Sequence, residues 1–216
     1  MYLITEELIF PPVQLARPDG ILAVGGDLSI ERLKLAYTNG IFPWYNEGEP
    51  IIWYSPDPRM VLFPNDLKVS KSMRKVMASN QFTFSENKAF DEVISHCKTV
   101  PRSGQGGTWI TNAMQQAYCE MHKNGWASSV EVWQEGKLVG GLYGIDLGNV
   151  FCGESMFSLV SNASKAGFIH LTSLLVDRGY HLIDCQVYNE HLASLGAIEI
   201  PRMEFLNYLK ESTLGT

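Results

Sequence analysis

The sequence lacks the residue patterns that usually hold a metal ion. It contains no CxxC, HxxxH or HExxH pattern, and its cysteines are widely spaced along the chain. Zinc sites depend on close ligand spacings of this kind, so we expect no metal site. We expect the cysteines to be free thiols in a reducing cytoplasm. They are Cys97, Cys119, Cys152 and Cys185.

Signals for export and for membrane insertion are also missing. The N-terminal stretch MYLITEELIFPPVQ has neither the basic flank nor the apolar run of a signal peptide. No stretch approaches the roughly 20 consecutive apolar residues that span a bilayer. We therefore expect a cytoplasmic protein that has no membrane partner.

Charged residues are few, and acidic residues outnumber basic ones. Of 216 residues, 19% are charged and 45% are apolar, and the net charge is −6. This composition allows a sizeable core, and the length suits one large domain or a main domain with a smaller one attached. An acidic chain does not bind nucleic acid indiscriminately, so any contact with RNA requires a local basic patch.

Motifs that activate a substrate are absent as well. There is no GxxxxGK(S/T) loop for ATP, no GxSxG turn, and no Cys/His pair that indicates a covalent intermediate. An acyl-transfer reaction would therefore need a donor that is already activated, without a further cofactor. An aminoacyl ester on tRNA meets that need.

The first sixty residues differ in composition from the rest, because they are rich in Gly, Pro and aromatic residues. A helix is predicted between a cap at Ser29 and a stop at Gly40. The cluster SPDPR, at 55–59, is typical of an exit from a small unit. We expect a small N-terminal α+β domain over residues 1–58 and a catalytic domain over 59–216.

The second region alternates helices and strands in a recognisable order. Helical spacing over 67–81, 90–97 and 110–125 precedes a period-two stretch over 128–158, which predicts a three-strand antiparallel meander. A helix over 164–178, the strand LIDCQV, a short helix capped by Asn189, the strand AIEI and the terminal helix MEFLNYLKES follow. This order resembles the α+β GNAT N-acyltransferase fold, although a generic α+β domain could share it. In the GNAT fold the acyl donor lies between two splayed central strands.

Coenzyme A is a poor candidate for the donor. GNAT enzymes hold its pyrophosphate on a Gly-rich turn that opens a helix. The equivalent segment, SNASKAGF at 161–168, lacks the (Q/R)xxGxG/A spacing. A coenzyme A-dependent acetyltransferase and a noncatalytic tRNA-binding module remain as the two alternative interpretations.

Eight short motifs, in order along nearly the whole chain, resemble the leucyl/phenylalanyl-tRNA–protein transferase family. They are GIFPWY (40–45), WYSPDPR (53–59), GTWIT (107–111), GLYG (141–144), GESMFS (153–158), NASK (162–165), LIDCQV (182–187) and HLASLGAIEIPR (191–202). The resemblance implies transfer of Leu or Phe, and also Met, from leucyl-tRNA or phenylalanyl-tRNA. The acceptors would be proteins with N-terminal Arg or Lys, which are then marked for N-end-rule degradation. We expect a monomer.

Three polar residues are candidates for the catalytic site. Asp184 and Gln186 lie two apart on a predicted strand and should share one face, so alanine at either position should lower the rate without unfolding the protein. By the resemblance, both act on the attacking amine, with the Gln186 carbonyl oxygen accepting one of its N–H groups. Glutamine is not a general base, so the proton passes to the ribose oxygen or through water. Glu154 and Asp184 are both candidates for binding the acceptor's basic side chain.

Substrate contacts are also assigned by the resemblance. Trp44 and Trp109 would flank the terminal adenosine of tRNA, with Tyr37 adding to that site. The amino-acid pocket should be apolar, and the candidates for it are Met156, Leu171 and Leu175.

The best basic patch lies in the stretch 67–85, which contains no acidic residue. Such a charge run is often only a solvated helix face. Against the acidic balance of the chain, however, it stands out. We predict that Lys71, Arg74 and Lys75 contact tRNA phosphates.

Overall fold

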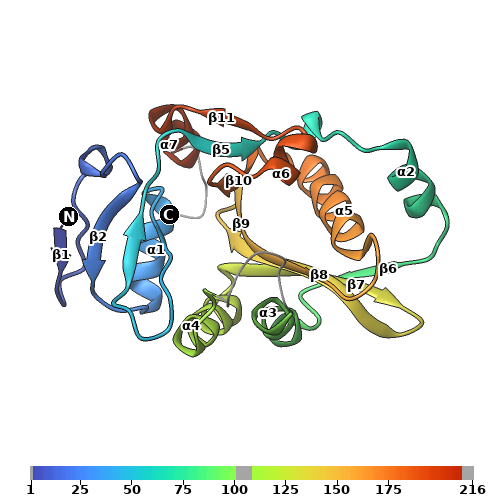
Figure 1. Cartoon of the computed structure of the whole chain (residues 1–216), viewed down its shortest axis with the longest axis horizontal. Coiled ribbons are helices and arrows are strands. Elements are labelled where there is room, and N and C mark those ends of the chain that lie inside the picture. The colour runs from blue at the N-terminus through green and yellow to red at the C-terminus, as the bar shows by residue number, and fades with distance from the viewer. Residues whose placement is uncertain (1, 101–108, 211–216) are drawn as a thin grey trace.

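The computed structural model describes residues 2–100 and 109–210, which are arranged around two β-sheets. A four-stranded sheet has the order β1-β2-β4-β3, and a seven-stranded sheet has the order β11-β5-β10-β9-β8-β7-β6. The smaller sheet, with helix α1, lies at one end of the molecule (Figure 1). In the described part of the chain, no helix is long and apolar enough to cross a membrane.

The smaller sheet is built from short segments of the Gly- and Pro-rich N-terminal region. Its strands are β1 (Tyr2–Ile4), β2 (Ile21–Gly25), β3 (Phe42–Pro43) and β4 (Ile52–Tyr54), and a 3₁₀ turn spans Val13–Leu15. Helix α1 (Ile30–Thr38) begins where the Ser29 hydroxyl accepts a hydrogen bond from the Arg32 N–H. The predicted helix start is therefore confirmed. Trp53 is fully buried and anchors the core of this part.

The predicted meander is confirmed in the larger sheet. Strands β7 (Ala127–Gln134), β8 (Lys137–Asp146) and β9 (Val150–Ser158) pair antiparallel in sequence order. The first hairpin turns at Glu135 and Gly136, which both have positive φ, as a two-residue turn of matching twist requires. Strand β6 (Thr83–Glu86) extends the sheet at the β7 edge.

Helices cover both faces of this sheet (Figure 1). Helices α3 (Phe90–Thr99) and α4 (Asn112–Lys123) lie on one face, and α5 (Ala163–Asp177) lies on the other. Gly167 lets α5 approach closely, since a Cβ there would stand 2.8 Å from Cγ2 of Val132. Helix α2 (Lys71–Ala78), which follows a 3₁₀ turn at Pro64–Asp66, packs beside α5.

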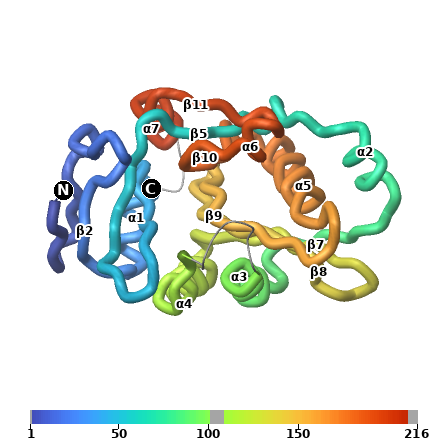
Figure 2. The backbone as a smooth tube through the Cα atoms, in the orientation of Figure 1, coloured from blue at the N-terminus to red at the C-terminus, as the bar shows by residue number. Residues whose placement is uncertain are grey.

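Strand β5 (Arg59–Leu62) leaves the N-terminal region and enters the larger sheet as the second strand from one edge. It lies between β10 (Leu182–Gln186) and β11 (Ile198–Ile200) and pairs antiparallel with both, as the backbone trace shows in Figure 2. The short helix α6 (Glu190–Ser194) connects β10 to β11. Helix α7 (Arg202–Lys210) closes the described chain, so the last two residues of the predicted terminal helix lie outside the described residues.

The central parallel pair separates soon after it forms. Strands β9 and β10 pair only from Val150 to Cys152 and from Leu182 to Asp184, and both strands continue beyond the ladder. This divergence is the feature expected of a GNAT-like α+β fold, and the predicted fold class is confirmed.

The smaller sheet ends at Tyr54 and β5 begins at Arg59. The division into domains of 1–58 and 59–216 stays a prediction.

Candidate functional site

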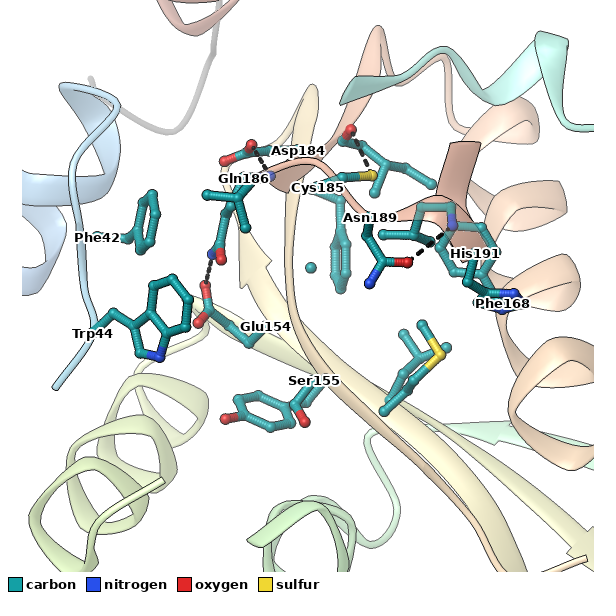
Figure 3. Close-up of a pocket in the computed structure, with 18 of the residues that line it drawn as sticks. Phe42, Trp44, Glu154, Ser155, Phe168, Asp184, Cys185, Gln186, Asn189 and His191 are labelled. Atoms are coloured by element: carbon teal, nitrogen blue, oxygen red, sulfur yellow. Dashed lines mark hydrogen bonds between the residues drawn. The ribbon is translucent and has the colours of Figure 1, made fainter. Parts of the chain in front are cut away.

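A pocket of about 390 Å³ opens where β9 and β10 diverge. Its walls come from five places in the chain: the segment around β3, Trp109, strand β8 at Leu142 and Tyr143, strand β9 with α5, and the end of β10 with α6. In Figure 3, Gln186 and Glu154 lie between the aromatic side chains of Phe42 and Trp44 and the opposite wall, which carries Phe168 and His191. The pocket thus has a polar centre between an aromatic side and an apolar side.

The polar centre begins with a bulge in β10. Regular strand alternation stops between Asp184 and Gln186, where the pairing with β5 shifts register. Gln186 has a φ of 67°, a left-handed conformation that non-glycine residues rarely adopt. The Gln186 N–H donates to Asp184 Oδ1 at 2.9 Å, which closes the bulge. The sequence predicts a regular strand with both side chains on one face. The bulge breaks that alternation, so Asp184 and Gln186 have different partners.

Asp184 is fully buried and paired with Arg59. Arg59 Nε donates to Asp184 Oδ1 at 2.8 Å, and Nη2 donates to Oδ2 at 2.7 Å. Burial disfavours the charged guanidinium, but the carboxylate outweighs this effect and raises the pKa of Arg59. Asp184 borders the pocket with its charge already compensated. Glu154 is therefore the carboxylate that is better placed to bind a basic group.

Glu154 collects three hydrogen bonds from different elements. Its Oε1 accepts from the Tyr37 hydroxyl at 2.8 Å and from Gln186 Nε2 at 2.9 Å, and its Oε2 accepts from the Tyr118 hydroxyl at 3.2 Å. Burial raises the pKa of Glu154 to about 7, although the tyrosine hydroxyls oppose that change. A carboxyl group of this kind changes charge near neutral pH.

Gln186 is oriented by Glu154. Its amide nitrogen donates to the carboxylate, so its carbonyl oxygen is the atom that remains for another partner. Within residues 2–100 and 109–210, no protein group donates to that oxygen. The site therefore offers an acceptor oxygen next to a carboxylate, which is an arrangement suited to a primary amine.

Tyr37 is buried beside the pocket and does not line it. Its ring is 2% exposed, and its hydroxyl bonds both Tyr118 and Glu154. A buried ring offers no free face for stacking, and the prediction that Tyr37 adds to an adenosine site stays a prediction. Its contribution to the site is the hydrogen bond that it donates to Glu154.

The two predicted stacking residues do meet at the pocket. Trp44 follows β3 and is 40% exposed, with its ring centre 5.7 Å from that of Tyr54. Trp109 lies just before α4 and also lines the pocket. In the motif GTWIT, Gly107 and Thr108 lie outside the described residues. Together, Trp44 and Trp109 bring indole rings from two separate parts of the sequence to one cavity.

The apolar side of the pocket contains two of the three predicted residues. Met156 and Leu171 line it, together with Phe168, Leu142 and Leu192. Leu175 is 1% exposed and packs in the core cluster beneath α5, so it is not a wall of the pocket. The helical spacing places Leu171 and Leu175 on one face, but the cavity ends one turn before Leu175.

The predicted basic patch is an exposed face of α2. Lys71, Arg74 and Lys75 are all exposed, and none of them forms an ion pair within the described residues. Figure 1 places α2 beyond α5, at the end of the molecule opposite the smaller sheet. The patch is therefore separate from the pocket, and a ligand that contacts both must be long.

Three residues of the site are missed by sequence reasoning. Phe168 and Tyr118 fall on inward faces of predicted helices, where they cannot be told from core residues. Arg59 is the last residue of the cluster SPDPR and stands directly before the apolar run MVLF. An arginine at the start of a buried strand needs a buried partner, and that signal points to an acidic residue elsewhere.

The fold is GNAT-like, and a pocket with a polar centre opens between its diverging central strands. Its parallel strands diverge around groups suited to an amine and around an apolar wall suited to an acyl side chain. The profile of the leucyl/phenylalanyl-tRNA protein transferase family matches residues 61–210, and the profile of its N-terminal domain matches residues 26–57. The chain belongs to this family.

Individual members of the family are similar in sequence to this chain over nearly its full length. The leucyl/phenylalanyl-tRNA–protein transferase of Flavobacterium johnsoniae is 62% identical over 210 residues, which cover 97% of this chain and 99% of that one. The protein of the same name from Syntrophobacter fumaroxidans is 55% identical over 212 residues, with 98% and 91% covered. A solved aminoglycoside acetyltransferase from a soil metagenome has a TM-score of 0.40 and 12% identity, with 61% of this chain and 89% of that chain covered.

Proposed function

We propose that the protein transfers Leu or Phe, and also Met, from aminoacyl-tRNA to the N-terminal Arg or Lys of acceptor proteins. The acceptor's α-amine attacks the ester carbonyl carbon, a C–N bond forms, and the C–O bond to the ribose breaks. The amine loses one proton and the ribose oxygen gains one. We further propose that the enzyme acts as a cytoplasmic monomer and that its products enter N-end-rule degradation.

The donor would occupy the two outer parts of the pocket. The terminal adenosine would stack on Trp44 and Trp109, which line the same cavity. The Leu or Phe side chain would lie on the apolar wall of Met156, Leu171 and Phe168. Apolar fit separates side chains that differ by one methyl only about 10–200-fold, so use of Met is expected.

The acceptor would enter at the polar centre. The carbonyl oxygen of Gln186 would accept an N–H from the attacking amine. Glu154 would supply the negative charge for the acceptor's basic group, since its carboxylate lies 2.9 Å from Gln186 Nε2. Holding both substrates in one cavity supplies much of the rate enhancement without a strong acid or base.

One observation carries this proposal. The Glu154–Gln186 pair lies in the gap between β9 and β10, with an aromatic wall on one side and an apolar wall on the other. An amine and an aminoacyl-adenosine can therefore meet at the same point. The exposed cations Lys71, Arg74 and Lys75 on α2 would contact tRNA phosphates outside the pocket.

A transfer assay tests the proposal. Radiolabelled Phe-tRNA is mixed with two acceptor proteins that differ only in having Arg or Ala as the N-terminal residue. We expect label on the α-amine of the Arg protein only. Binding of Phe-tRNA without transfer would favour a noncatalytic tRNA-binding module. Transfer of label from acetyl-coenzyme A instead would favour an ordinary acetyltransferase.

A further inference from the structure

The Arg59 guanidinium is buried next to two residues that line the pocket, Phe42 and Asp184. It is 1% exposed and donates two hydrogen bonds to Asp184 and a third, from Nη1, to the Gly40 carbonyl oxygen at 3.1 Å. Its central carbon lies 4.8 Å from the ring centre of Phe42 and 4.6 Å from that of Phe205. The two aromatic rings therefore hold the guanidinium in the plane of its ion pair with Asp184.

Asp184 connects the fixed Arg59 side chain to the backbone of Gln186. The Oδ1 atom that receives Arg59 Nε also receives the backbone N–H of Gln186, at 2.8 and 2.9 Å respectively. Gln186 has left-handed φ, a conformation that persists only where the surroundings hold it. The direction of the Gln186 side chain thus depends on a carboxylate whose own position depends on Arg59.

We propose that Arg59 is a positioning residue for the transfer reaction, which acts through Asp184 to hold the Gln186 carbonyl oxygen toward the incoming amine. This inference rests on the proposed function of the site. It assigns Asp184 to alignment rather than to contact with the acceptor. Because Gly40 and Phe42 precede Trp44, the same guanidinium also ties the aromatic wall to β10.

Lysine is the informative replacement at this position. It keeps the positive charge beside Asp184, but it lacks the planar fork that donates two parallel hydrogen bonds. We expect Arg59→Lys to lower kcat at least 10-fold with saturating substrates. The KM for Phe-tRNA should stay within 2-fold. Arg178→Lys is the matched control, since Arg178 pairs with Glu86 at the surface, and both constants should stay within 2-fold.

Rates are expressed per molecule that binds a nonhydrolysable Phe-adenosine analogue, so that loss of folded protein does not count as loss of catalysis. A kcat within 2-fold of wild type for Arg59→Lys would overturn the proposal. So would a loss confined to the KM for Phe-tRNA, which would indicate an effect on the aromatic wall alone.

A second measurement is independent of activity. Hydrogen exchange at the Gln186 amide reports its bond to Asp184 directly, and the Ile183 amide serves as the reference within the same strand. We expect at least 10-fold faster exchange at Gln186 in Arg59→Lys, with Ile183 within 2-fold. Equal exchange at Gln186 in both proteins would overturn the positioning role. If the exchange rates at Gln186 differ as expected but the wild-type protein transfers no label, the proposed function is wrong. The positioning of Gln186 by Arg59 is then still supported.

Discussion

Two opposing effects act on the pKa of the Glu154 carboxyl group. Burial raises its pKa, whereas the hydroxyls of Tyr37 and Tyr118 stabilise the anion. The balance leaves its pKa at about 7, above the ordinary value of 4.5. Folded protein therefore binds this proton more tightly than unfolded protein does.

Stability should consequently fall as the pH rises through neutrality. The contribution of Glu154 is fully present below the unfolded pKa and is lost as the pH rises through the folded pKa of about 7. We expect wild type to lose on the order of 1–3 kcal/mol relative to Glu154→Gln between pH 5 and pH 8. Urea unfolding at both pH values measures the difference. Glu120→Gln, at an exposed position on α4, should follow wild type, and parallel curves for wild type and Glu154→Gln would contradict the prediction.

The two polar residues of β10 should differ in their effects on stability. Asp184→Ala leaves a buried Arg59 charge without its partner, and we expect a loss of about 3–5 kcal/mol. Gln186→Ala removes a partly buried amide and should cost about 1 kcal/mol or less, while lowering kcat. The sequence predicts only that both variants stay folded, and the ion pair adds the expectation that Asp184→Ala is the less stable of the two. Urea unfolding of both variants tests it, and equal midpoints would contradict it.

At the level of secondary-structure elements, the exposed face of α2 can be tested separately from the pocket, because the two lie apart. We expect Lys71→Glu with Arg74→Glu to weaken binding of Phe-tRNA and to reduce its salt dependence by roughly 0.7–0.9 in log–log slope per lost phosphate contact. Filter binding across a salt series measures both quantities. Lys88→Glu, before α3 on the other face of the sheet, makes one of the two charge reversals at a site away from the patch and should keep the wild-type slope. An unchanged slope in the α2 variant would remove the patch from the site.

Elements with local signals are predictable from this sequence. Ser29 and Asn189 cap the helices that follow them, and the turn at Glu135 and Gly136 sets the meander. Each of these depends on residues within four positions along the chain. The resemblance to the family likewise places Trp44 and Gln186 at one pocket.

Features that depend on distant partners are not predictable in the same way. Arg59 and Asp184 lie 125 positions apart, and only the insertion of β5 beside β10 brings them together. The bulge at Gln186 is hidden because a strand pattern gives no sign of positive φ outside glycine. The burial of Tyr37 depends on Tyr118 and Glu154, which come from other elements.

At the scale of the whole molecule, Gly40 is the point where α1, α7 and Arg59 meet. Its φ is 72°, and a Cβ there would stand 2.8 Å from Cδ2 of Leu206 on α7. Gly40→Ala should therefore lower stability by about 1–3 kcal/mol, from backbone strain together with displacement of α7. Gly48→Ala shares the positive φ but has open space, so it measures the backbone strain alone. Thermal unfolding of both variants tests this, and equal losses would show that contact with α7 contributes nothing.

The hydrogen bond from Tyr37 to Glu154 has a consequence for how the gene can be shortened. A truncated chain that starts at Arg59 would keep β9 and β10 but lose the phenol that faces Glu154 and the indole of Trp44. Its Glu154 carboxyl group would be left with fewer donors, and the cavity would lose the wall formed by Phe42, Pro43 and Trp44. The N-terminal segment is thus part of the candidate site, and adding it back as a separate polypeptide is the natural complementation experiment.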